Sequence, residues 1–459
     1  MDKVLSKIKN IYLIGIGGIG MSGLAILLKD KGYNVKGSDI EESYITKMLK
    51  NEGIEVFVGH RRENITDDTH LVCYSSAIKE NNPEMSEAKK KGINILQRGK
   101  LLGLIAWDKK SITVSGSHGK TTTASLIGYM LTSLGFGPTV FVGGLPLNYT
   151  RNAWWGEEYF VIEADESDGS FLYYNPWVSI ITNIDHEHLD YYKNIDNLKT
   201  SFLQFAYQTK GAVIGCGDDP LVRDILKKVN GISYGFGQDN VIRADNFYFD
   251  GEFSCFDFLI EQKLIGQIKI PLLGKHNALN TIAVLAFLKY MGLDLIKAIE
   301  MFKSFKGTKR RFQIKKKTGG VTFVDDYAHH PTEIEAVLKA ARYLNPKRVF
   351  VIFQPHRFSR VEYLSKQFAQ SFSYADELIV TDIYSAQEKQ ISGVNVTTLL
   401  DEIRRIFKGK ITHIPKDRLI AEVPNYIKEG DLVLGLGAGD INTIMEQIVN
   451  EFESSRVKA

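Results

Sequence analysis

The sequence predicts an α/β protein with several domains, and three observations support this prediction. The chain has 459 residues, which at ~150 residues per domain corresponds to roughly three domains. Short apolar runs typical of strands alternate with helix-like segments, a pattern that indicates parallel sheets covered by helices. Two glycine-rich turns, at 15–20 and 116–119, each lie between a predicted strand and a predicted helix.

Composition and charge exclude several classes of protein. The net charge of +3 and the hydrophobic content of 44% fit a globular enzyme, and the charge is too small to indicate a nucleic-acid or anionic-membrane partner. Three well-separated cysteines, Cys73, Cys216 and Cys255, predict a reducing cytoplasm without a disulfide framework or zinc site. The uncharged segment 11–28 contains five glycines and no following cleavage site, so we expect neither a signal peptide nor a membrane anchor.

The first block of the chain ends near residue 108. Predicted strands alternate with predicted helices at Ile11–Ile14, Ile19–Lys31, Asn34–Gly37, Tyr44–Asn51, Leu71–Tyr74 and Pro83–Lys91. The turn from Gly15 to Gly20 matches G-x-G-x-x-G in the correct strand-to-helix context, and Asp39 follows at the end of the next strand. Such a turn presents backbone N–H groups to any pyrophosphate. It therefore allows either an NAD-dependent oxidoreductase or an enzyme that binds a UDP-sugar.

The second block carries a shortened phosphate loop, Gly116-Ser-His-Gly-Lys-Thr121, between a predicted strand at Ser111–Ser115 and a predicted helix at Lys120–Leu134. Backbone N–H groups and the helix N-terminus converge there, which suits a polyphosphate. Lys120 is expected to reach the outer phosphates, and the Thr121 hydroxyl to bind Mg²⁺. Because a hydride-transfer enzyme rarely needs a separate phosphate loop, this loop weighs against the oxidoreductase.

Acidic and histidine side chains follow the next strands of this block. Strand Tyr159–Ile162 leads into Glu163-Ala-Asp-Glu-Ser-Asp168, an acidic run that is costly to pack without a cation, so we expect at least one of these carboxylates to bind a metal. Strand Val178–Thr182 leads to His186-Glu-His188, whose spacing does not match a zinc motif and favours a histidine near Mg²⁺. Strand Ala212–Ile214, a β-rich stretch over 241–271 and a helix over 276–290 follow.

The third block, from about Lys309, has polar clusters at the ends of its predicted strands. These strands are Val321–Val324, Arg348–Phe353, Glu377–Thr381 and Leu432–Leu436, and polar strand ends indicate a binding crevice in an open α/β sheet. The Lys309-Arg310-Arg311 run could place a guanidinium on a γ-phosphate when domains close. Arg357 and Arg360 are either a fork for a carboxylate or surface charges.

Eight motifs in order resemble those of the Mur ligase family, over essentially the whole chain. They are Gly15-Ile-Gly-Gly-Ile-Gly-Met-Ser22, Gly116-Ser-His-Gly-Lys-Thr-Thr-Thr123, Glu163-Ala-Asp-Glu-Ser-Asp168, the segment from Thr182-Asn-Ile to His188-Leu-Asp190, Gly274-Lys-His-Asn-Ala-Leu-Asn280, Arg310-Arg-Phe-Gln313, Asp325-Asp-Tyr-Ala-His-His-Pro-Thr332 and Gln354-Pro-His-Arg-Phe-Ser-Arg360. The resemblance implies a UDP-sugar-binding Rossmann-like domain over 1–108, a central P-loop ATPase domain over 109–308 and a C-terminal Rossmann-like domain over 309–459 that binds the amino acid.

The resemblance also implies site residues by matched position. ATP would contact Gly116, Ser117, His118, Gly119, Lys120, Thr121, Thr122, Asn277 and Asn280 (adenine), Arg311 (γ-phosphate) and Asp326 (ribose). Thr121 would hold one Mg²⁺, and Glu163 and His188 would hold a second. The catalytic residues would be Lys120, Glu163, His188 and Arg311. The UDP-sugar would contact Gly15, Gly17, Gly18, Gly20, Ser38, Asp39, Ser75, Ser76 and Ala77, and the amino acid would contact Tyr327, His329, Arg357 and Arg360.

The implied reaction is an ATP-dependent ligation. ATP would phosphorylate the lactyl carboxylate of UDP-N-acetylmuramate, and the amine of L-alanine would attack the resulting acyl phosphate. Mg²⁺, Lys120 and the arginines would stabilise the crowded anionic groups. The alternative within the family is a recycling ligase that joins a tripeptide to the same sugar nucleotide. Tyr327 and the Gly-Ser-His loop favour the alanine-adding branch.

Overall fold

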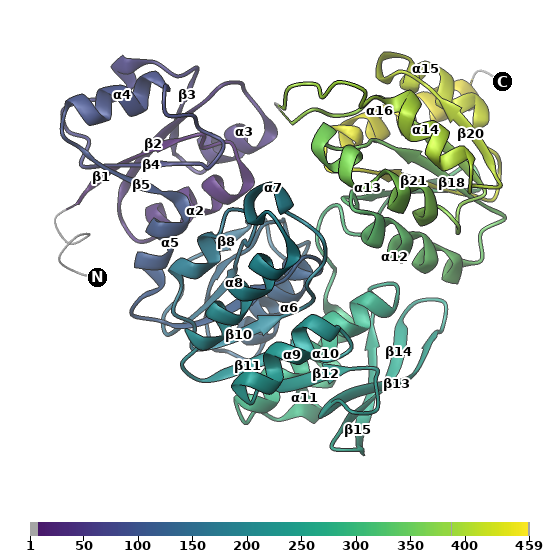
Figure 1. Cartoon of the computed structure of the whole chain (residues 1–459), viewed down its shortest axis with the longest axis horizontal. Coiled ribbons are helices and arrows are strands. Elements are labelled where there is room, and N and C mark those ends of the chain that lie inside the picture. The colour runs from purple at the N-terminus through teal and green to yellow at the C-terminus, as the bar shows by residue number, and fades with distance from the viewer. Residues whose placement is uncertain (1–7, 387, 458–459) are drawn as a thin grey trace. The chain divides into compact units, whose positions relative to one another are not determined.

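The computed structural model describes residues 8–386 and 388–457 (Figure 1). Contacts within the chain group it into two compact units. The first unit contains residues 1–246, 256–268 and 279–306, and the second contains residues 247–255, 269–278 and 307–459. The N-terminal and central domains expected from the sequence both fall largely within the first unit, and their exact boundaries stay predictions. Within the described residues, the structure contains no helix with the length and apolar character of a membrane span.

A five-stranded parallel sheet forms the N-terminal part of the first unit, in the order β3-β2-β1-β4-β5. The chain crosses from one side of β1 to the other between β3 and β4, so the turns after β1 and β4 lie at a topological switch point, where ligands bind in open α/β sheets. The elements are β1 (Asn10–Ile14), α2 (Ile19–Asp30), β2 (Asn34–Asp39), α3 (Tyr44–Asn51), β3 (Glu55–Val58), β4 (Leu71–Tyr74), α4 (Pro83–Lys90), β5 (Asn94–Gln97) and α5 (Arg98–Ala106).

Local sequence signals explain where several of these helices begin. Ser43 caps α3 with a reciprocal capping box to Thr46, and Asn82 caps α4, which has Pro83 in its first turn. The predicted strands and helices of this block are confirmed to within a few residues. Strands β3 and β5 and helix α5 were not predicted, because the two edge strands are short and only partly buried.

The central sheet has ten strands in the order β15-β14-β13-β12-β11-β10-β6-β9-β7-β8. Strand β6 lies between its parallel neighbours β10 and β9, so the carboxyl ends of these three strands meet at one edge. The β-rich stretch expected over 241–271 is confirmed by β13 to β15. The elements are β6 (Lys110–Ser115), α6 (Lys120–Ser133), β7 (Thr139–Phe141), β8 (Ala153–Trp154), β9 (Tyr159–Glu163), β10 (Val178–Ile181), α7 (Leu189–Tyr192), α8 (Ile195–Tyr207), β11 (Ala212–Cys216), α9 (Pro220–Val229), β12 (Ile232–Gly235), β13 (Ile242–Phe249), β14 (Ser254–Ile260), β15 (Lys263–Ile270), α10 (Lys275–Tyr290) and α11 (Leu295–Met301).

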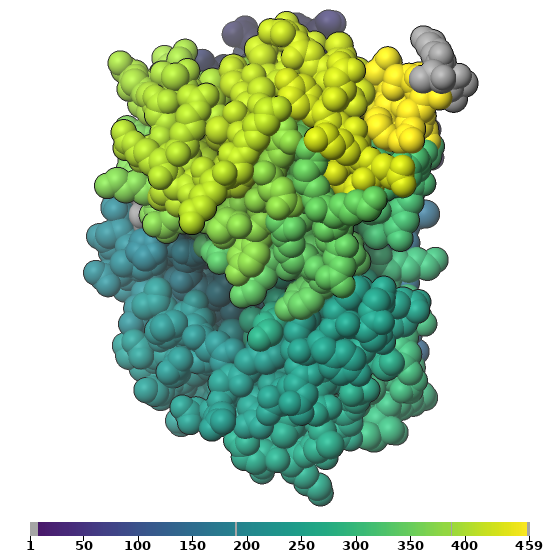
Figure 2. All heavy atoms as spheres, turned by 90° about the vertical axis from the view of Figure 1, so that its right-hand side faces the viewer, coloured from purple at the N-terminus to yellow at the C-terminus, as the bar shows by residue number. Residues whose placement is uncertain are grey.

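The C-terminal sheet belongs to the second unit and has the order β16-β17-β21-β18-β19-β20. Its strands are parallel except for the edge strand β16. Buried apolar clusters cover both faces of this sheet. In Figure 2, the part of the chain from β16 to α16 is coloured green to yellow. The elements are β16 (Gln313–Thr318), β17 (Val321–Asp326), α12 (Pro331–Ala341), β18 (Arg348–Phe353), α13 (Phe358–Ser371), β19 (Glu377–Val380), α14 (Val396–Arg404), β20 (Lys410–His413), α15 (Leu419–Glu422), β21 (Asp431–Leu436) and α16 (Ile441–Val457).

Candidate active site

The phosphate loop connects β6 to α6 in the first unit, as predicted. Gly116 and Gly119 have φ values of 133° and 84°, which favour glycine. A Cβ at Gly119 would lie 2.5 Å from Asn280 Oδ1, so the close approach also requires glycine. The loop after β10 supports this turn, because Asn183 Oδ1 accepts a hydrogen bond from the His118 N–H at 2.8 Å and Asn183 O accepts one from the Ser117 N–H at 3.0 Å.

Lys120 is held at the first position of α6 by three acceptors. Its ammonium donates to the backbone oxygens of Gly116 and Ser117 and to Glu166 Oε1, the last at 2.8 Å. The Lys120 side chain is 16% exposed and that of Glu166 1%. Burial favours neutral forms, but the attraction between the two groups raises the pKa of Lys120 and lowers the pKa of Glu166. A buried cation therefore stands at the helix N-terminus, where a phosphate would bind.

Glu163 lies at the end of β9 and contacts the helix that follows the loop. Thr121 Oγ1 donates a hydrogen bond to Glu163 Oε1 at 2.7 Å, and the Gly143 N–H donates to Oε2. A second group, Glu166, Glu187 and His188, offers three ligand atoms that all lie within 4.8 Å of one another. Burial opposes protonation of His188, but the neighbouring carboxylate of Glu166 raises its pKa. The structure thus brings Thr121 and Glu163 together, and it pairs His188 with Glu166.

The acidic run 163–168 is neutralised largely by the protein's own cations. Asp165 Oδ2 accepts a hydrogen bond from Arg98 Nη2 at 3.2 Å, and Glu166 pairs with Lys120. Burial alone would raise the pKa of Asp165, but Arg98 and Lys120 lower it to about 2. Two basic side chains, Arg98 and Lys120, therefore supply the positive charge that we expected this run to need. That one of these acids also binds a metal stays a prediction.

The glycine loop after β1 is closed by Asp39, at the end of β2. Asp39 Oδ2 accepts a hydrogen bond from the Gly17 N–H at 2.8 Å, and Ser38 O accepts from the Gly15 N–H. Ser75, after β4, lies against Gly15, so the loops after β1, β2 and β4 are brought together. Ser76 and Ala77 are exposed next to them. Gly18 precedes α2 as its N-cap, and Gly20 lies in its first turn.

A buried carboxylate beneath this loop was not predicted. Glu84 is fully buried and accepts hydrogen bonds from Tyr12 at 2.8 Å, Ser38 at 2.7 Å and Asn64 at 2.6 Å, with His60 Nδ1 2.9 Å away. The Ser38 hydroxyl is therefore bonded to Glu84, while its backbone oxygen supports the glycine loop; its predicted contact with the UDP-sugar stays a prediction. No local motif distinguishes Glu84 from the other acids of the chain.

Helix α10 carries the two predicted adenine contacts. Asn280 Oδ1 accepts a hydrogen bond from Thr123 Oγ1 at 3.2 Å, which attaches this helix to α6 within the first unit. Asn277 is buried and donates to Leu273 O at 2.9 Å. Thr122 is also buried, in the first turn of α6.

The second unit gathers charged and aromatic residues at the carboxyl end of β17. Asp326 accepts hydrogen bonds from the N–H groups of Phe312 at 2.6 Å and Ala328 at 2.7 Å, and burial raises its pKa to about 6. The guanidinium carbons of Arg310 and Arg311 lie 4.9 and 5.4 Å from the centre of the Tyr327 ring. Asp326, Arg311 and Tyr327 are thus close together in the second unit, and their contacts with the ribose, the γ-phosphate and the amino acid stay predictions.

A row of rings continues from this group toward β18 and β19. The ring centres of Tyr327 and His329 are 5.2 Å apart, those of His329 and His356 5.7 Å, and those of His356 and Tyr384 5.7 Å. Arg360 Nη1 lies 3.0 Å from His356 Nδ1. Neither His356 nor Tyr384 was predicted as a site residue, although both follow predicted strands in the strand-end polar clusters.

Arg357 takes a different position from Arg360. It is the N-cap of α13 with a φ of 69°, which an L-residue adopts rarely and which often marks a functional constraint. Its side chain is 42% exposed, with Glu388 Oε1 3.9 Å from Nε. The two arginines therefore have separate local partners.

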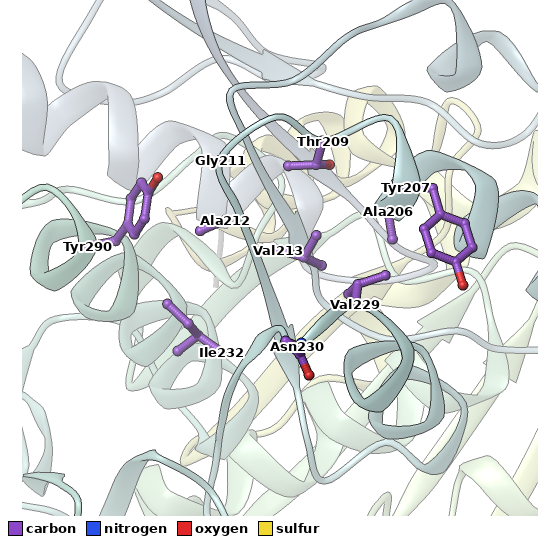
Figure 3. Close-up of a pocket in the computed structure, with 10 residues that line it drawn as sticks. All are labelled: Ala206, Tyr207, Thr209, Gly211, Ala212, Val213, Val229, Asn230, Ile232 and Tyr290. Carbon is purple, nitrogen blue, oxygen red and sulfur yellow. The ribbon is translucent and has the colours of Figure 1, made fainter.

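A pocket of about 420 Å³ lies elsewhere in the first unit (Figure 3). Its lining includes Ala212 and Val213 at the start of β11, together with Tyr207, Asn230 and Tyr290. Because β11, β10 and β6 are parallel, this pocket is at the amino edge of the sheet. The phosphate loop follows the carboxyl edge, so the pocket is not part of the site.

Three sequence models of one family match successive parts of the chain. They are described as the Mur ligase family catalytic domain, over residues 10–110, the Mur ligase middle domain, over residues 114–288, and the Mur ligase glutamate ligase domain, over residues 310–439. Together they cover both glycine loops and the ring cluster of the second unit.

Individual proteins match over nearly the full length. A UDP-N-acetylmuramate–L-alanine ligase of Carboxydothermus hydrogenoformans is 42% identical over 97% of this chain and 97% of its own. The protein of the same name from Caldanaerobacter subterraneus subsp. tengcongensis is 43% identical over 98% and 99%. The crystal structure of a UDP-N-acetylmuramate–alanine ligase from Thermotoga maritima matches with a TM-score of 0.84 and 30% identity, covering 98% of this chain and 100% of that one.

Proposed function

Because the chain belongs to the Mur ligase family, we propose that it is an ATP-dependent ligase that joins L-alanine to the lactyl carboxylate of UDP-N-acetylmuramate. The observation that carries this proposal is the buried Lys120 at the N-terminus of α6, next to the Thr121–Glu163 hydrogen bond. Two relatives of this name, each more than 40% identical over almost the whole chain, support the choice of substrates. They do not favour the tripeptide-joining branch or the oxidoreductase.

We propose Mg²⁺ as the metal, on the chemistry of the side chains around the phosphate loop. The donors are carboxylates, a hydroxyl and one imidazole, without a thiolate, and hard oxygen donors suit Mg²⁺. Glu166 Oε2 is buried and has no hydrogen-bond partner among the described residues, so it retains free lone pairs in this cluster. Thr121 would hold one ion, and Glu163 and His188 would hold a second, with Glu166 next to His188. When bound, Mg²⁺ would offset negative charge on the phosphates.

The first chemical step would form an acyl phosphate. An oxygen of the lactyl carboxylate attacks the γ-phosphorus of ATP, the bond to the bridging oxygen breaks, and ADP leaves. Lys120 remains protonated, because the surrounding carboxylates raise its pKa despite burial. Its ammonium would exchange its contact with Glu166 for the transferred phosphoryl group, and backbone N–H groups of the loop would hold the other phosphates.

The second step would use residues of the second unit. The neutral amine of L-alanine attacks the acyl carbon and a tetrahedral intermediate forms. Its nitrogen then loses a proton to solvent, and the bond to the phosphate oxygen breaks, so that phosphate leaves and the amide is made. Arg357 and Arg360 would bind the carboxylate of L-alanine, since guanidinium groups suit this charge and shape. Burial and the nearby Arg360 lower the pKa of His329 well below its ordinary value, so its ring is neutral and adds no positive charge near the amino group.

A substrate panel tests the proposal. Purified protein with ATP, Mg²⁺ and UDP-N-acetylmuramate would receive L-alanine, L-serine, glycine, the murein tripeptide or NADH, and ADP release and the mass of the sugar nucleotide would be followed. We expect a mass gain of one alanyl residue with L-alanine, dependent on all co-substrates. A product with the tripeptide alone would assign the recycling reaction, and no ADP with any acceptor would reject the proposal. A cytoplasmic location, where these substrates are made, is part of the same proposal.

A further inference from the structure

Arg98 connects two parts of the first unit that carry different glycine loops. It is the first residue of α5, and its side chain is 15% exposed. One nitrogen, Nη2, donates to Asp165 Oδ2 at 3.2 Å. The other, Nη1, would be only 2.5 Å from a Cβ at Gly20, so the guanidinium lies directly against the first turn of α2. The cation is therefore shared between the segment after the first glycine loop and the acidic run near the phosphate loop.

Hydrogen bonds within the acidic run hold Asp165 in place. Its other oxygen, Oδ1, accepts from the Ser167 N–H at 3.0 Å, and its backbone oxygen accepts from Ser170 Oγ at 3.2 Å. Gly99 follows Arg98, and a Cβ added at this glycine would lie only 2.5 Å from the Ser170 side chain. The start of α5 thus packs tightly on this segment, and Arg98 holds the charged side chain at its centre.

The charges alternate from one loop to the other. Arg98 pairs with Asp165, Asp165 acts electrostatically on Lys120, and Lys120 binds Glu166. Lys120 therefore lies near two carboxylates, and the one at Asp165 is already neutralised by Arg98. If Arg98 were absent, both carboxylates would compete for the Lys120 ammonium. Asp39 and Glu84 do not compete for Lys120 in this way, because they accept hydrogen bonds from Gly17 and Ser38 in the N-terminal part.

We propose that Arg98 is a positioning residue for the ligase reaction, which keeps Asp165 from capturing Lys120 and so leaves the ammonium available to the phosphates of ATP. The proposal rests on the function given above, and it assigns to a residue outside the phosphate loop a role in nucleotide binding. The proposal predicts a suppressor substitution. Once Arg98 is replaced, a second substitution that neutralises Asp165 should restore the affinity for nucleotide. A purely structural contact would show the same rescue in Tm, but the folded single variant would bind ADP as tightly as wild type.

The test measures the dissociation constant for ADP and for a non-hydrolysable ATP analogue by calorimetry, with Mg²⁺ and without the other substrates. We expect Arg98→Met to weaken binding about tenfold, a size typical of couplings between adjacent charges. The double variant Arg98→Met/Asp165→Asn should return to within about threefold of wild type. Steady-state kinetics should show the same order, with the KM for ATP changed more than kcat.

Two matched controls separate this role from loss of an interdomain contact. Arg151 in the central part binds Glu52 of the N-terminal part at 2.6 Å, so Arg151→Met removes a comparable ion pair distant from the loop and should leave the ADP affinity unchanged. Asp168 also lies near Arg98 but is held by the Ser170 N–H at 3.0 Å. Arg98→Met/Asp168→Asn should therefore remain weak.

Unchanged ADP affinity in Arg98→Met, or equal weakness of the single variant and the Asp165→Asn double variant, would overturn the proposal. If Arg98→Met does not fold, Asp165→Asn alone decides, because it removes the competing carboxylate and should bind ADP at least as tightly as wild type; weaker binding would overturn the role. Failure of the proposed function appears separately, as wild-type protein that binds no ATP or makes no product in the substrate panel.

Discussion

Replacing Lys120 by methionine should separate the catalytic role of this side chain from its structural one. The ammonium donates to Glu166 at 2.8 Å, and the Glu166 side chain is 1% exposed. Removing one partner of a buried ion pair costs about 3–5 kcal/mol, because the other charge stays buried and unpaired. At roughly 2–4 °C per kcal/mol for a domain of this size, we expect Lys120→Met to lower Tm by roughly 6–20 °C.

The activity should fall for a different reason. Loss of a preorganised group that stabilises developing charge costs about 10²–10³-fold in kcat, and we expect at least this loss in ADP release. The double variant Lys120→Met/Glu166→Gln removes the stranded charge, so it should regain most of the Tm and none of the activity. Scanning fluorimetry and a coupled ADP assay measure the two effects on the same samples.

Two results would refute this reasoning. Turnover near the wild-type rate in Lys120→Met would show that the ammonium does not meet the phosphates. A double variant as unstable as the single one would show that the stability of the loop does not depend on the pairing of Lys120 with Glu166. Recovery of activity together with Tm would mean that the single variant was inactive only because it was unfolded.

Three further perturbations test other parts of the site. Arg357→Ala should raise the KM for L-alanine about 10–100-fold with little change in kcat, as expected for loss of a charged hydrogen bond; an unchanged KM would make this arginine a surface residue. Chelation of divalent cations should abolish ADP release, and Glu163→Gln, which keeps an acceptor for Thr121, should raise the Mg²⁺ concentration needed for half-maximal rate; an unshifted requirement would exclude Glu163 as a ligand. Burial raises the pKa of Asp326 to about 6 from its ordinary value of 3.8, so between these pH values the folded state retains a proton that the unfolded chain releases. Its stabilising contribution is therefore present below pH 4 and lost as the pH rises to 6, by about 3 kcal/mol; Asp326→Asn should flatten Tm between pH 4 and 7 relative to wild type, and parallel pH profiles would contradict the assignment.

Local sequence signals were sufficient for the elements that carry the loops. The strand–glycine–helix patterns at Gly15 and Gly116 specify both the turn and its place at a strand end, and the structure confirms the helices that follow. Edge strands β3, β5 and β16 were missed for a physical reason. Each packs on one side only, so its sequence is half polar, and β16 contains three consecutive lysines at 315–317.

The partners of the site residues could not be predicted from neighbouring sequence. Asn183 supports the phosphate loop, Arg98 neutralises Asp165 and Glu84 accepts a hydrogen bond from Ser38 of β2, but each lies far along the chain from the group it contacts. These contacts depend on which strands become neighbours, and strand order is a property of the whole sheet. The acidic run shows the result, because its balancing cations come from helices α5 and α6.

The hydrogen bond between Thr123 and Asn280 spans 157 positions of the chain. A ribosome that adds about 5–20 residues per second needs roughly 8–31 s to cover this interval. During that time a nascent polypeptide has made its phosphate loop but not the amide that closes against it. Nucleotide should therefore be retained only after α10 has emerged from the exit tunnel, and chains that stall earlier should pass through an ATP-agarose column unbound.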